Sequence, residues 1–382
     1  MKKTICFVAT TPFAVNAFLR THMLAFVERY EVILCVNTAA YPLSEDLVFG
    51  VSVIHVDIAR KIAPMADIRA LLQLFRIFVK AKPCVVHSIT PKAGLLAMMA
   101  ARLAGIMFRF HTFTGQVWAS REGLGRIVLK SLDRLIVVLA SRVFADSASQ
   151  CRYLETESVV RPDGISMLGH GSIAGVNLAR FHPDSAIRAQ LRSEFALTDN
   201  VAVFLYVGRL AKDKGVFDLV ASFNQVAESH QACELWVVGP DEENLLSELQ
   251  AEAQKGSGKF RWLGRTMEPE HYMAAADIFV LPSYREGFGS VVIEAAACGV
   301  PAVAYRTEGI VDAVVENETG ILVTKFDRKA FAGAMMHLAA DLDFRRELGE
   351  KALKRARSEF SSDSVTAEWL GFYDCLLRGN PK

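Results

Sequence analysis

The stretch ADIFVLPSYREGFGSVVIEAAACGVP occupies residues 276–301 and decides the fold. Its apolar start, DIFVLP, predicts a buried strand, the glycines that follow predict a loop, and SVVIEAAAC predicts a short helix. Gly299 and Pro301 end that helix and begin a further apolar run, PAVAY. A strand, a loop, a helix and another strand in this order form the repeating unit of a parallel sheet whose faces are covered by helices.

The same alternation runs along nearly the whole chain, so the sequence predicts an α/β protein. Its strand candidates are near-continuous apolar runs, which are typical of parallel strands buried on both faces. They lie at residues 4–10, 31–37, 51–56, 84–88, 107–112 and 142–146 in the first half, and at 201–208, 233–239, 259–264, 277–282, 301–305 and 320–324 in the second.

The strand rhythm pauses once, at residues 180–200, where polarity rises. We therefore predict two doubly wound domains, residues 1–182 and 183–360. A final amphipathic helix at about residues 361–382 is expected to pack back on the first domain. Since ligands bind at the carboxyl ends of parallel strands, the cleft between the two domains is the expected active site.

Hydrophobic residues make up 52% of the 382 residues, which is ample core material for two globular domains. No apolar run reaches the length of about 20 residues that spans a bilayer. The N-terminal MKKTICFVATTPFAV has the look of a secretion signal, but TICFVAT also fits a first buried strand, which we favour. Seven scattered cysteines without a CxxC pair are typical of a reduced cytosolic protein.

Charge is distributed unevenly between the two halves. Residues 1–180 hold 21 Lys and Arg against 12 Asp and Glu, a balance of +9, whereas residues 181–382 hold 22 against 30, a balance of −8. The expected helix within 121–142 carries Arg126, Lys130 and Arg134 four residues apart, beside apolar positions. Such a helix fits an anionic membrane surface, and it equally fits a packed helix with a solvated basic stripe.

Two glutamates stand in the quoted stretch, where folding alone does not require them. Glu286 falls in the loop at the carboxyl end of the strand, and Gly287 and Gly289 allow backbone amides to approach a ligand closely. Glu294 lies about one turn into the helix, where a carboxylate can accept both hydroxyls of a vicinal diol. Alternatively, Glu286 caps the helix and Glu294 pairs with a base. We favour ligand binding, because an unpaired buried carboxylate is costly.

A second candidate, YVGRLAKDKGVFDLV at residues 206–220, follows another expected strand. Arg209 comes directly after the strand and its glycine, and Lys214 precedes Gly215 at the start of a helix. Two cations beside a helix N-terminus suit a diphosphate. The alternative is a solvated loop that is merely basic.

Several common cofactor motifs are missing. GHGSIAG at residues 169–175 does not satisfy GxGxxG, and the first strand is followed by TTPFAV without a glycine-rich turn. The chain contains neither GxxxxGK[ST] nor HExxH, and its DxD, at residues 341–343, fits a helix cap. We therefore expect no dinucleotide cofactor and no metal site.

EGFGSVVIE at residues 286–294, together with GRLAKDKG at 208–215, resembles the retaining nucleotide-sugar glycosyltransferases of family 4. HTFTGQVW at 111–118 and DSASQ at 146–150 further resemble the bacterial O-antigen and capsule members of that family. Residues 85–105, 169–183 and 312–323 are also similar to that family, so the resemblance covers essentially the whole chain. It implies the GT-B fold, in which two Rossmann-like domains face each other across a cleft. The first domain would serve the acceptor and the second the donor.

By position, the resemblance implies that Arg209 and Lys214 bind the donor diphosphate and that Glu294 binds the ribose hydroxyls. Glu286 and the backbone of Gly287, Phe288 and Gly289 would contact the donor sugar.

A histidine of the first domain near the reacting centre is also implied, and His111 in FRFHTFTGQVW stands after a strand in that place, with a packed histidine as the alternative. The catalytic candidates are thus His111, Arg209, Lys214 and Glu286. The chain departs from the family where TTPFAVNAF replaces a Gly-Gly turn, which leaves Thr11 and Asn16 as acceptor-side candidates.

The resemblance implies a metal-independent, retaining transferase without a cofactor, for which a UDP-sugar is the co-substrate. The expected reaction moves a sugar, an N-acetylhexosamine, to a polyprenyl-diphosphate-linked saccharide during surface polysaccharide synthesis. The enzyme would be cytoplasmic, peripheral at the inner face of the plasma membrane, and without a nucleic-acid partner. A UDP-sugar 2-epimerase on the same scaffold and a non-catalytic nucleotide- or carbohydrate-binding module remain as alternatives.

Overall fold

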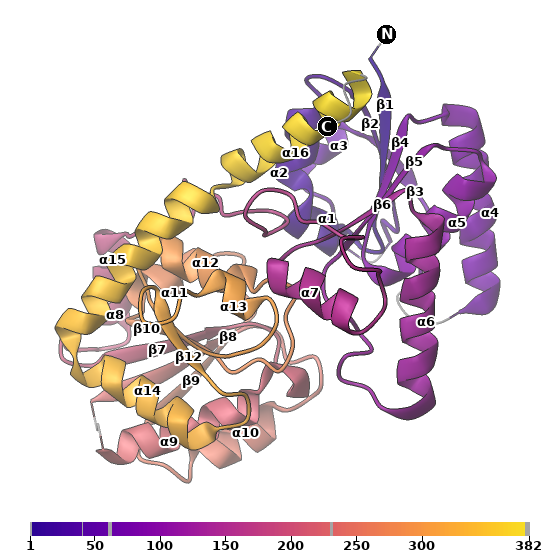
Figure 1. Cartoon of the computed structure of the whole chain (residues 1–382). Helices are drawn as coiled ribbons and strands as arrows, with labels where there is room; N and C mark the ends of the chain where they lie inside the picture. The colour runs from indigo at the N-terminus through magenta and orange to yellow at the C-terminus, as the bar shows by residue number, and fades with distance from the viewer. Residues whose placement is uncertain (1, 40, 60–62, 230–231, 379–382) are drawn as a thin grey trace. The chain divides into compact units, whose positions relative to one another are not determined.

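The computed structural model describes residues 2–39, 41–59, 63–229 and 232–378. The chain divides into two compact units: residues up to Ala174 together with the C-terminal segment from Ser362, and Gly175–Ser361 (Figure 1). The predicted boundary after residue 182 is therefore too late. Val176 already belongs to the second unit, because its N–H donates to the Phe360 carbonyl at 2.7 Å.

The first unit contains a six-stranded parallel sheet in the order β3-β2-β1-β4-β5-β6. The strand order reverses between β1 and β4, which is the point where doubly wound sheets bind ligands. The strands are β1 (Thr4–Val8), β2 (Glu31–Val36), β3 (Ser52–His55), β4 (Val85–Ile89), β5 (Phe108–Phe113) and β6 (Arg142–Ala145).

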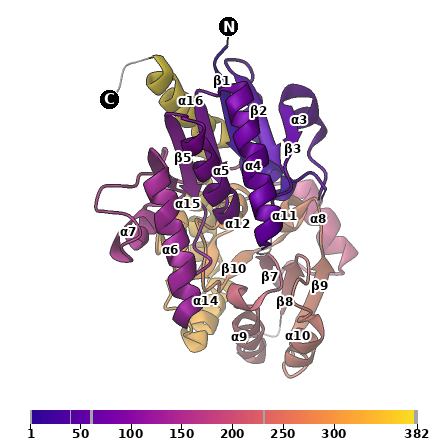
Figure 2. The ribbon, with the colours of Figure 1, turned by 90° about the vertical axis from the view of Figure 1, so that its right-hand side faces the viewer.

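Helices cover both faces of this sheet, because alternate strand residues such as Phe7 and Val8 enter separate cores. One face packs against α1 (Pro12–Phe18), α2 (Arg20–Phe26), α3 (Glu45–Gly50) and α16 (Ser362–Arg378). The other face packs against α4 (Pro64–Ala81), α5 (Pro91–Leu103), α6 (Gly123–Leu139) and α7 (Ala148–Thr156). Figure 2 shows α4, α5 and α6 side by side.

Helix α16 joins the first unit through buried aromatic and histidine side chains. Trp369 stacks on His22 and on His87, with ring centroids 4.5 and 5.1 Å apart. The Tyr373 hydroxyl lies 2.6 Å from Nδ1 of His87. Desolvation lowers the pKa of His22 to about 4 and that of His87 to about 3, so both imidazoles are neutral at physiological pH. Residues 379–382 of the predicted final helix lie outside the described residues.

The second unit repeats the architecture, with the strand order β12-β11-β10-β7-β8-β9 and a reversal between β7 and β10. Its strands are β7 (Ala202–Val207), β8 (Cys233–Val238), β9 (Lys259–Gly264), β10 (Ile278–Leu281), β11 (Ala302–Tyr305) and β12 (Gly320–Val323). The prediction of two doubly wound α/β domains is confirmed by these two sheets.

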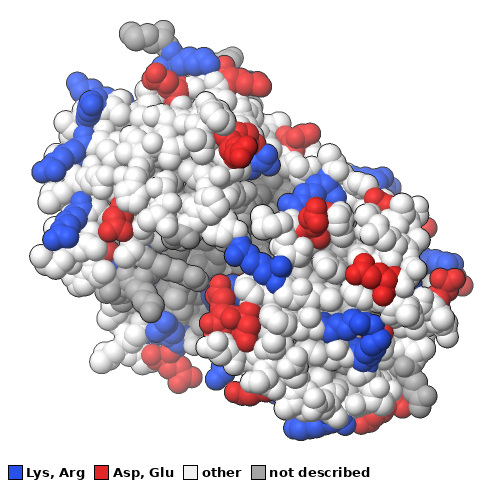
Figure 3. Space-filling view, turned by 180° about the vertical axis from the view of Figure 1, so that it is seen from behind, with Lys and Arg blue, Asp and Glu red and all other residues white. Residues whose placement is uncertain are grey.

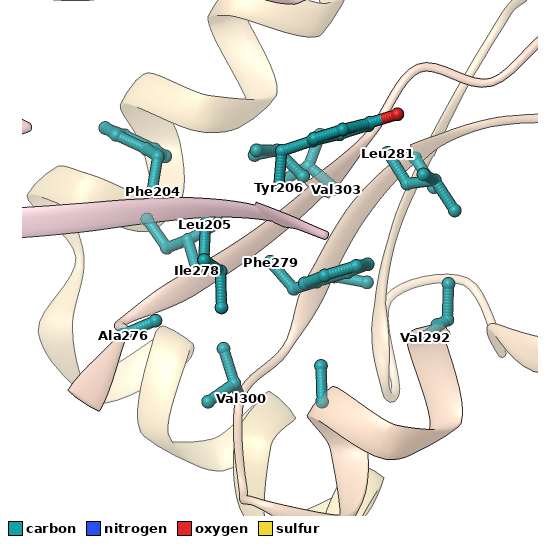
Figure 4. Close-up of a cluster of buried hydrophobic side chains, with 14 of the residues drawn as sticks. Phe204, Leu205, Tyr206, Ala276, Ile278, Phe279, Leu281, Val292, Val300 and Val303 are labelled. Atoms are coloured by element: carbon teal, nitrogen blue, oxygen red, sulfur yellow. The ribbon is translucent and has the colours of Figure 1, made fainter. Parts of the chain in front are cut away.

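Helices also cover both faces of the second sheet (Figure 1). On one face lie α9 (Val216–Ser229), α10 (Leu246–Ala253) and α14 (Arg328–Ala340), and on the other α8 (Ser185–Glu194), α11 (Pro269–Ala275), α12 (Ser290–Ala297) and α15 (Leu342–Glu359). Phe279, Val292 and Val300 fill the space between β10 and α12 (Figure 4). Among the described residues, none of the helices combines the length and the hydropathy that a membrane span requires.

Asp277, directly before β10, joins two elements of the second unit through a buried carboxylate. Its Oδ2 accepts hydrogen bonds from the Val203 N–H at 2.9 Å and from Arg192 Nη1 at 3.2 Å. Its Oδ1 accepts one from Arg188 Nη2 at 2.6 Å. Because Arg192 is itself buried, loss of this carboxylate leaves a buried positive charge without its counter-ion.

Asp277→Ala should therefore lower the free energy of unfolding of the second unit by about 3–5 kcal/mol. Denaturant unfolding followed by tryptophan fluorescence measures the change. Glu347→Ala is the matched control, because it removes an exposed pair with Lys351 on α15 and should cost about 0.5 kcal/mol or less. Equal effects of the two substitutions would contradict this account.

Candidate functional site

Two loops of the second unit meet at the carboxyl ends of β7 and β10. The Tyr284 N–H donates to the Asp213 carbonyl at 2.9 Å, and Arg285 pairs with the Asp213 carboxylate at 3.1 Å. Gly215 has a φ of +67°, and a Cβ on it would lie 1.9 Å from the Pro282 carbonyl oxygen. Only glycine permits so close an approach, so the loops after β7 and β10 form one continuous surface.

Lys214 and Glu286, one from each loop, form an ion pair. Lys214 Nζ lies 2.6 Å from Glu286 Oε1, and both side chains are mostly buried. Sequence reasoning placed each near a ligand, and the structure brings them together. A cation beside a hydrogen-bond acceptor can face a ligand that carries both an anionic group and hydroxyls.

Arg209 lies in the same loop but engages a different partner. Its Nη1 is 2.8 Å from Glu242 Oε2 in the loop after β8, and both side chains are about one-third exposed. The Tyr206 hydroxyl donates to the Arg209 carbonyl at 2.8 Å and thereby holds the backbone at this turn. Arg209 and Lys214 thus share a loop, while each takes part in its own ion pair.

In the Gly287–Gly289 segment, backbone groups rather than side chains are available to a ligand. Phe288 is buried, and its ring packs against Phe360 with centroids 5.2 Å apart. Gly289 precedes α12 with a φ of +86°, and a Cβ on Gly309 would lie 2.4 Å from the Gly287 carbonyl oxygen. Phe288 therefore anchors the loop, and the surrounding amides are the groups that can approach a ligand.

Glu294 occupies the second turn of α12 in a half-buried position. Burial raises its pKa from 4.5 to about 7; the charge of Arg180 opposes this rise, and that of Glu270 adds to it. Arg180 forms a bidentate pair with Glu270, with N–O distances of 2.7 and 2.6 Å, and also donates to the Met267 carbonyl. The simple ion pair considered as an alternative for Glu294 is absent among the described residues, because Arg180 pairs with Glu270 instead.

A buried network behind the loops was missed in the sequence. Asp218 is almost fully buried, and its Oδ2 accepts hydrogen bonds from the Tyr284 hydroxyl at 2.9 Å and the Tyr305 hydroxyl at 3.0 Å. Its Oδ1 pairs with Arg328. Because Tyr284 stands two residues before Glu286, this network fixes the loop that carries Glu286. The sequence shows the residue types but not their contacts, because the four residues of the network come from separate segments of the chain.

His111 lies inside β5 of the first unit rather than after a strand. It is fully buried, and its Nδ1 is 2.9 Å from Ser88 Oγ. A Cβ on Gly94 would lie 2.4 Å from His111 Cε1, so glycine is needed to make room for the ring. Burial lowers the His111 pKa to about 3, and its Nε2 has no hydrogen-bond partner among the described residues. The ring is therefore neutral, with one unsatisfied nitrogen.

The acceptor-side candidates take part in local structure. Thr11 caps α1 by accepting from the Ala14 N–H at 3.4 Å. Asn16 bridges to the segment before α3: it donates to the Pro42 carbonyl at 3.1 Å and accepts from the Ser44 N–H at 3.1 Å.

At the strand-order reversal itself, the Thr10 hydroxyl lies 2.7 Å from that of Thr90. Thr90 adopts a φ of +71°, which is strained for a β-branched residue. Neither residue was singled out in the sequence.

Within the part of the chain that the structure describes, no group of three or more His, Cys, Asp or Glu side chains is arranged to hold a metal ion. The groups gathered at the ends of β7 and β10 are instead the ion pairs Lys214–Glu286 and Arg285–Asp213, together with Arg209 and the backbone amides of a glycine-containing loop.

Comparison with known proteins identifies the class. Residues 187–355 match the glycosyl transferases group 1 family, and residues 15–171 match the glycosyl transferase 4-like domain. The capsular polysaccharide biosynthesis glycosyltransferase CapM of Staphylococcus aureus is 32% identical over 320 residues, which are 84% of each chain. The chain therefore belongs to the group 1 glycosyl transferases, and it is a glycosyltransferase.

Two further matches agree with the family and the fold. The UDP-Gal:alpha-D-GlcNAc-diphosphoundecaprenol alpha-1,3-galactosyltransferase of Escherichia coli is 26% identical over 74% of this chain and 73% of that protein. The structure of Anabaena Alr3699/HepE in complex with UDP and glucose matches with a TM-score of 0.80 at 17% identity, over 97% of this chain and 99% of that one. The family match gives no support to the 2-epimerase alternative.

The raised pKa of Glu294 makes a prediction about folding stability. Below its ordinary pKa of 4.5 the side chain is protonated in both the folded and the unfolded chain. As the pH rises toward 7, the unfolded chain ionises first, so the stability contributed by this residue is lost progressively up to about pH 7. Glu294→Gln removes that loss, so its melting temperature relative to the wild type should be higher at about pH 8 than at about pH 5.

Melting temperatures measured across that pH range provide the test. Glu294→Ala is the companion variant, because it also removes the carboxyl group and should show the same trend with pH. A difference between Glu294→Gln and the wild type that does not change with pH would contradict the raised pKa.

Proposed function

We propose that this glycosyltransferase transfers a sugar, an N-acetylhexosamine, from a UDP-sugar to a polyprenyl-diphosphate-linked saccharide during surface polysaccharide synthesis. The observation that carries the proposal is the Lys214–Glu286 pair at the reversal point of the second sheet. It places a cation and a hydroxyl acceptor together where such sheets bind nucleotides. The printed names of the relatives support the substrates: one acts in capsule biosynthesis and another on a diphosphoundecaprenol-linked sugar.

The donor diphosphate is assigned to Lys214 and Arg209. Arg209 pairs with Glu242 and Lys214 pairs with Glu286, and these ion pairs hold the two cations in position. Each cation can donate to a diphosphate oxygen while it remains paired with its glutamate. The amides of the Gly287–Gly289 loop, at the start of α12, add further donors for negative charge. These groups would stabilise the charge that develops on the departing UDP, without a metal ion.

The two glutamates are assigned to different parts of the donor. Glu286 would accept hydroxyls of the sugar, since it shares Lys214 with the diphosphate to which the sugar is attached. Glu294 would accept the ribose hydroxyls from α12. An ionised carboxylate accepts two hydroxyls better than a protonated one, so donor binding would favour loss of the Glu294 proton. We assign neither glutamate as a nucleophile. Retention, which the family resemblance implies, would then come from attack of the acceptor on the same face of the sugar that the departing UDP leaves.

His111 is assigned to the reacting centre through its unsatisfied Nε2. As a neutral imidazole, it can accept a hydrogen bond but does not carry charge into the site. Its complete burial also fits the alternative of a packed histidine, and the His111 variants below distinguish the two roles. We further propose that the enzyme works in the cytoplasm at the inner face of the membrane, where a polyprenyl-linked acceptor is held.

Substitution of the two glutamates should separate binding from transfer. Glu294→Ala should weaken UDP affinity about 10- to 100-fold, because it removes hydrogen bonds to a charged group worth about 1.5–3 kcal/mol. Glu286→Ala should keep UDP affinity within about threefold and slow transfer about 100-fold or more, because its contacts are to the reacting sugar. Titration calorimetry with UDP, and transfer from UDP-N-acetylhexosamines to a synthetic polyprenyl-diphosphate saccharide, measure the two effects.

Glu316→Ala is the control, because it removes only the exposed pair with Arg306 in the same unit. A thermal-shift panel of UDP, UDP-sugars and NAD should show stabilisation by the uridine nucleotides alone. No response to any nucleotide would sink the proposal, and equal effects of the two glutamate variants on UDP affinity would undo the division of roles.

His111→Gln and His111→Ala should lose transfer while they retain UDP affinity. The glutamine variant keeps a polar group beside Ser88, so it guards against loss of folding, which its melting temperature would reveal. Unchanged transfer in a folded His111→Gln variant would establish the packed-histidine alternative.

A further inference from the structure

The exposed face of α6 is mostly apolar, with Ser131 and Arg134 as its polar side chains. Leu124 and Val138, near its two ends, are 81% and 78% exposed, and Ile127, Val128 and Leu135 are exposed between them. Throughout Gly123–Leu139, all of which the structure describes, no acidic side chain is exposed. An ordinary surface helix turns its polar side to water, so this orientation needs an explanation.

The basic stripe expected on α6 is largely turned inward. Arg126 and Lys130 pair with Glu157 at 2.8 and 2.7 Å, and both lie over the Trp118 ring. These two cations are therefore not the solvated basic stripe that the sequence offered as one alternative for this helix. With two of its basic residues held against the body of the unit, the helix presents its aliphatic side outward.

Helix α4 has an exposed face of the same kind. Its acidic residue, Asp67, pairs with Lys92 at 2.6 Å. The exposed side chains of α4 are aliphatic or basic: Met65, Ile68, Leu72 and Val79, with Arg69, Arg76 and Lys80 between them. Two helices of one unit thus share a surface composed of aliphatic and basic side chains, which we call the α4–α6 face.

The α4–α6 face lies on one side of the first unit. Helix α5 packs between α4 and α6, so the two exposed helix faces flank it on the same side of the sheet (Figure 2). Lys and Arg side chains also line the edge of the first unit on which α4 lies (Figure 3). In a parallel sheet the helix after each strand begins at the carboxyl edge. Met65 and Leu124 therefore begin the face at the edge where Thr10 and Thr90 meet.

We infer that the α4–α6 face docks on an anionic phospholipid bilayer. The exposed charged side chains of α4 and α6, two helices that the structure describes throughout, are all basic: Arg69, Arg76, Lys80 and Arg134. They attract negatively charged headgroups. The aliphatic side chains enter the boundary between headgroups and acyl chains. A second copy of this chain is a poorer occupant, because a shared face would bring the same positive charge to both sides.

This inference deepens the proposed function and rests on it for the lipid-linked acceptor, but it concerns a surface remote in sequence from the donor loops. A face that begins at the carboxyl edge of the first sheet would hold that edge near the headgroup layer. The diphosphate of a polyprenyl-linked acceptor lies in the same layer. The bilayer surface would thus deliver the acceptor to the Thr10–Thr90 end of the sheet.

Vesicle flotation of the full-length protein tests the docking surface. The wild type should bind phosphatidylcholine vesicles that contain phosphatidylglycerol, and should bind pure phosphatidylcholine vesicles about tenfold less. Leu124→Glu/Ile127→Glu should lower binding to the anionic vesicles about tenfold or more, because it places negative charge in the apolar face. Phe49→Glu is the matched control: Phe49 is 89% exposed on α3, which packs on the opposite face of the same sheet, so binding should not change.

A second pair of substitutions, Ile68→Glu/Leu72→Glu on α4, carries the same test if the α6 variant does not fold. Wild-type binding that is independent of phosphatidylglycerol, or that survives both double variants, would overturn the inference. A wild-type dimer that Leu124→Glu/Ile127→Glu converts to a monomer in sedimentation would overturn it in favour of a second copy.

The outcome is separable from that of the proposed function. Vesicle binding requires no nucleotide. Vesicle binding by a protein that UDP does not stabilise would therefore contradict the proposed function and leave the docking surface standing. Transfer to a soluble short-chain acceptor without vesicle binding would contradict the docking surface and leave the proposed function standing.

Discussion

The close approach of Gly215 to the Pro282 carbonyl is the constraint on which the candidate donor site depends. A side chain at position 215 would meet that oxygen at 1.9 Å, so the loops after β7 and β10 can touch only because this residue is glycine. Their contact allows Lys214 to reach Glu286 and Tyr284 to reach the Asp213 backbone. The reversal of strand order between β7 and β10 places the two loops side by side, and the glycine lets them close into one surface.

The buried carboxylates of the second unit fall into two kinds, those with a structural role and one that is a candidate for ligand binding. Asp277 and Asp218 are buried, and their oxygens are occupied by backbone, arginine and tyrosine donors, so little capacity remains for a ligand. Glu294 differs, because the nearby Arg180 is already held by Glu270. Its desolvation is therefore only partly compensated, and its pKa rises to about 7. This uncompensated desolvation is the reason for which a ligand role is proposed for Glu294 and not for Asp277 or Asp218.

The sheets could be predicted from the sequence because parallel strands buried on both faces are continuous apolar runs, such as VAVFLYVG at 201–208. The loop positions of Lys214 and Glu286 followed from strand ends, although no local pattern reveals that they pair. Arg180 and Glu270 were missed because their contact spans 90 residues and neither lies in a periodic pattern. The inward turn of the α6 cations was missed for a related reason, since it depends on Glu157, which lies beyond the next strand.

The first unit combines a polar strand edge with an apolar outer face, and one topology accounts for both. Each βα connection ends a strand and starts a helix at the same edge, so the Thr10–Thr90 contact and the first turns of α4 and α6 share one edge of the sheet. Exposure of aliphatic side chains on these helices to water is unfavourable. Their transfer into the boundary between headgroups and acyl chains would stabilise the membrane-bound state. The polar edge would then open onto the layer that holds lipid diphosphates. The proposed docking face and the proposed acceptor site would thus both depend on the same arrangement of strands and helices.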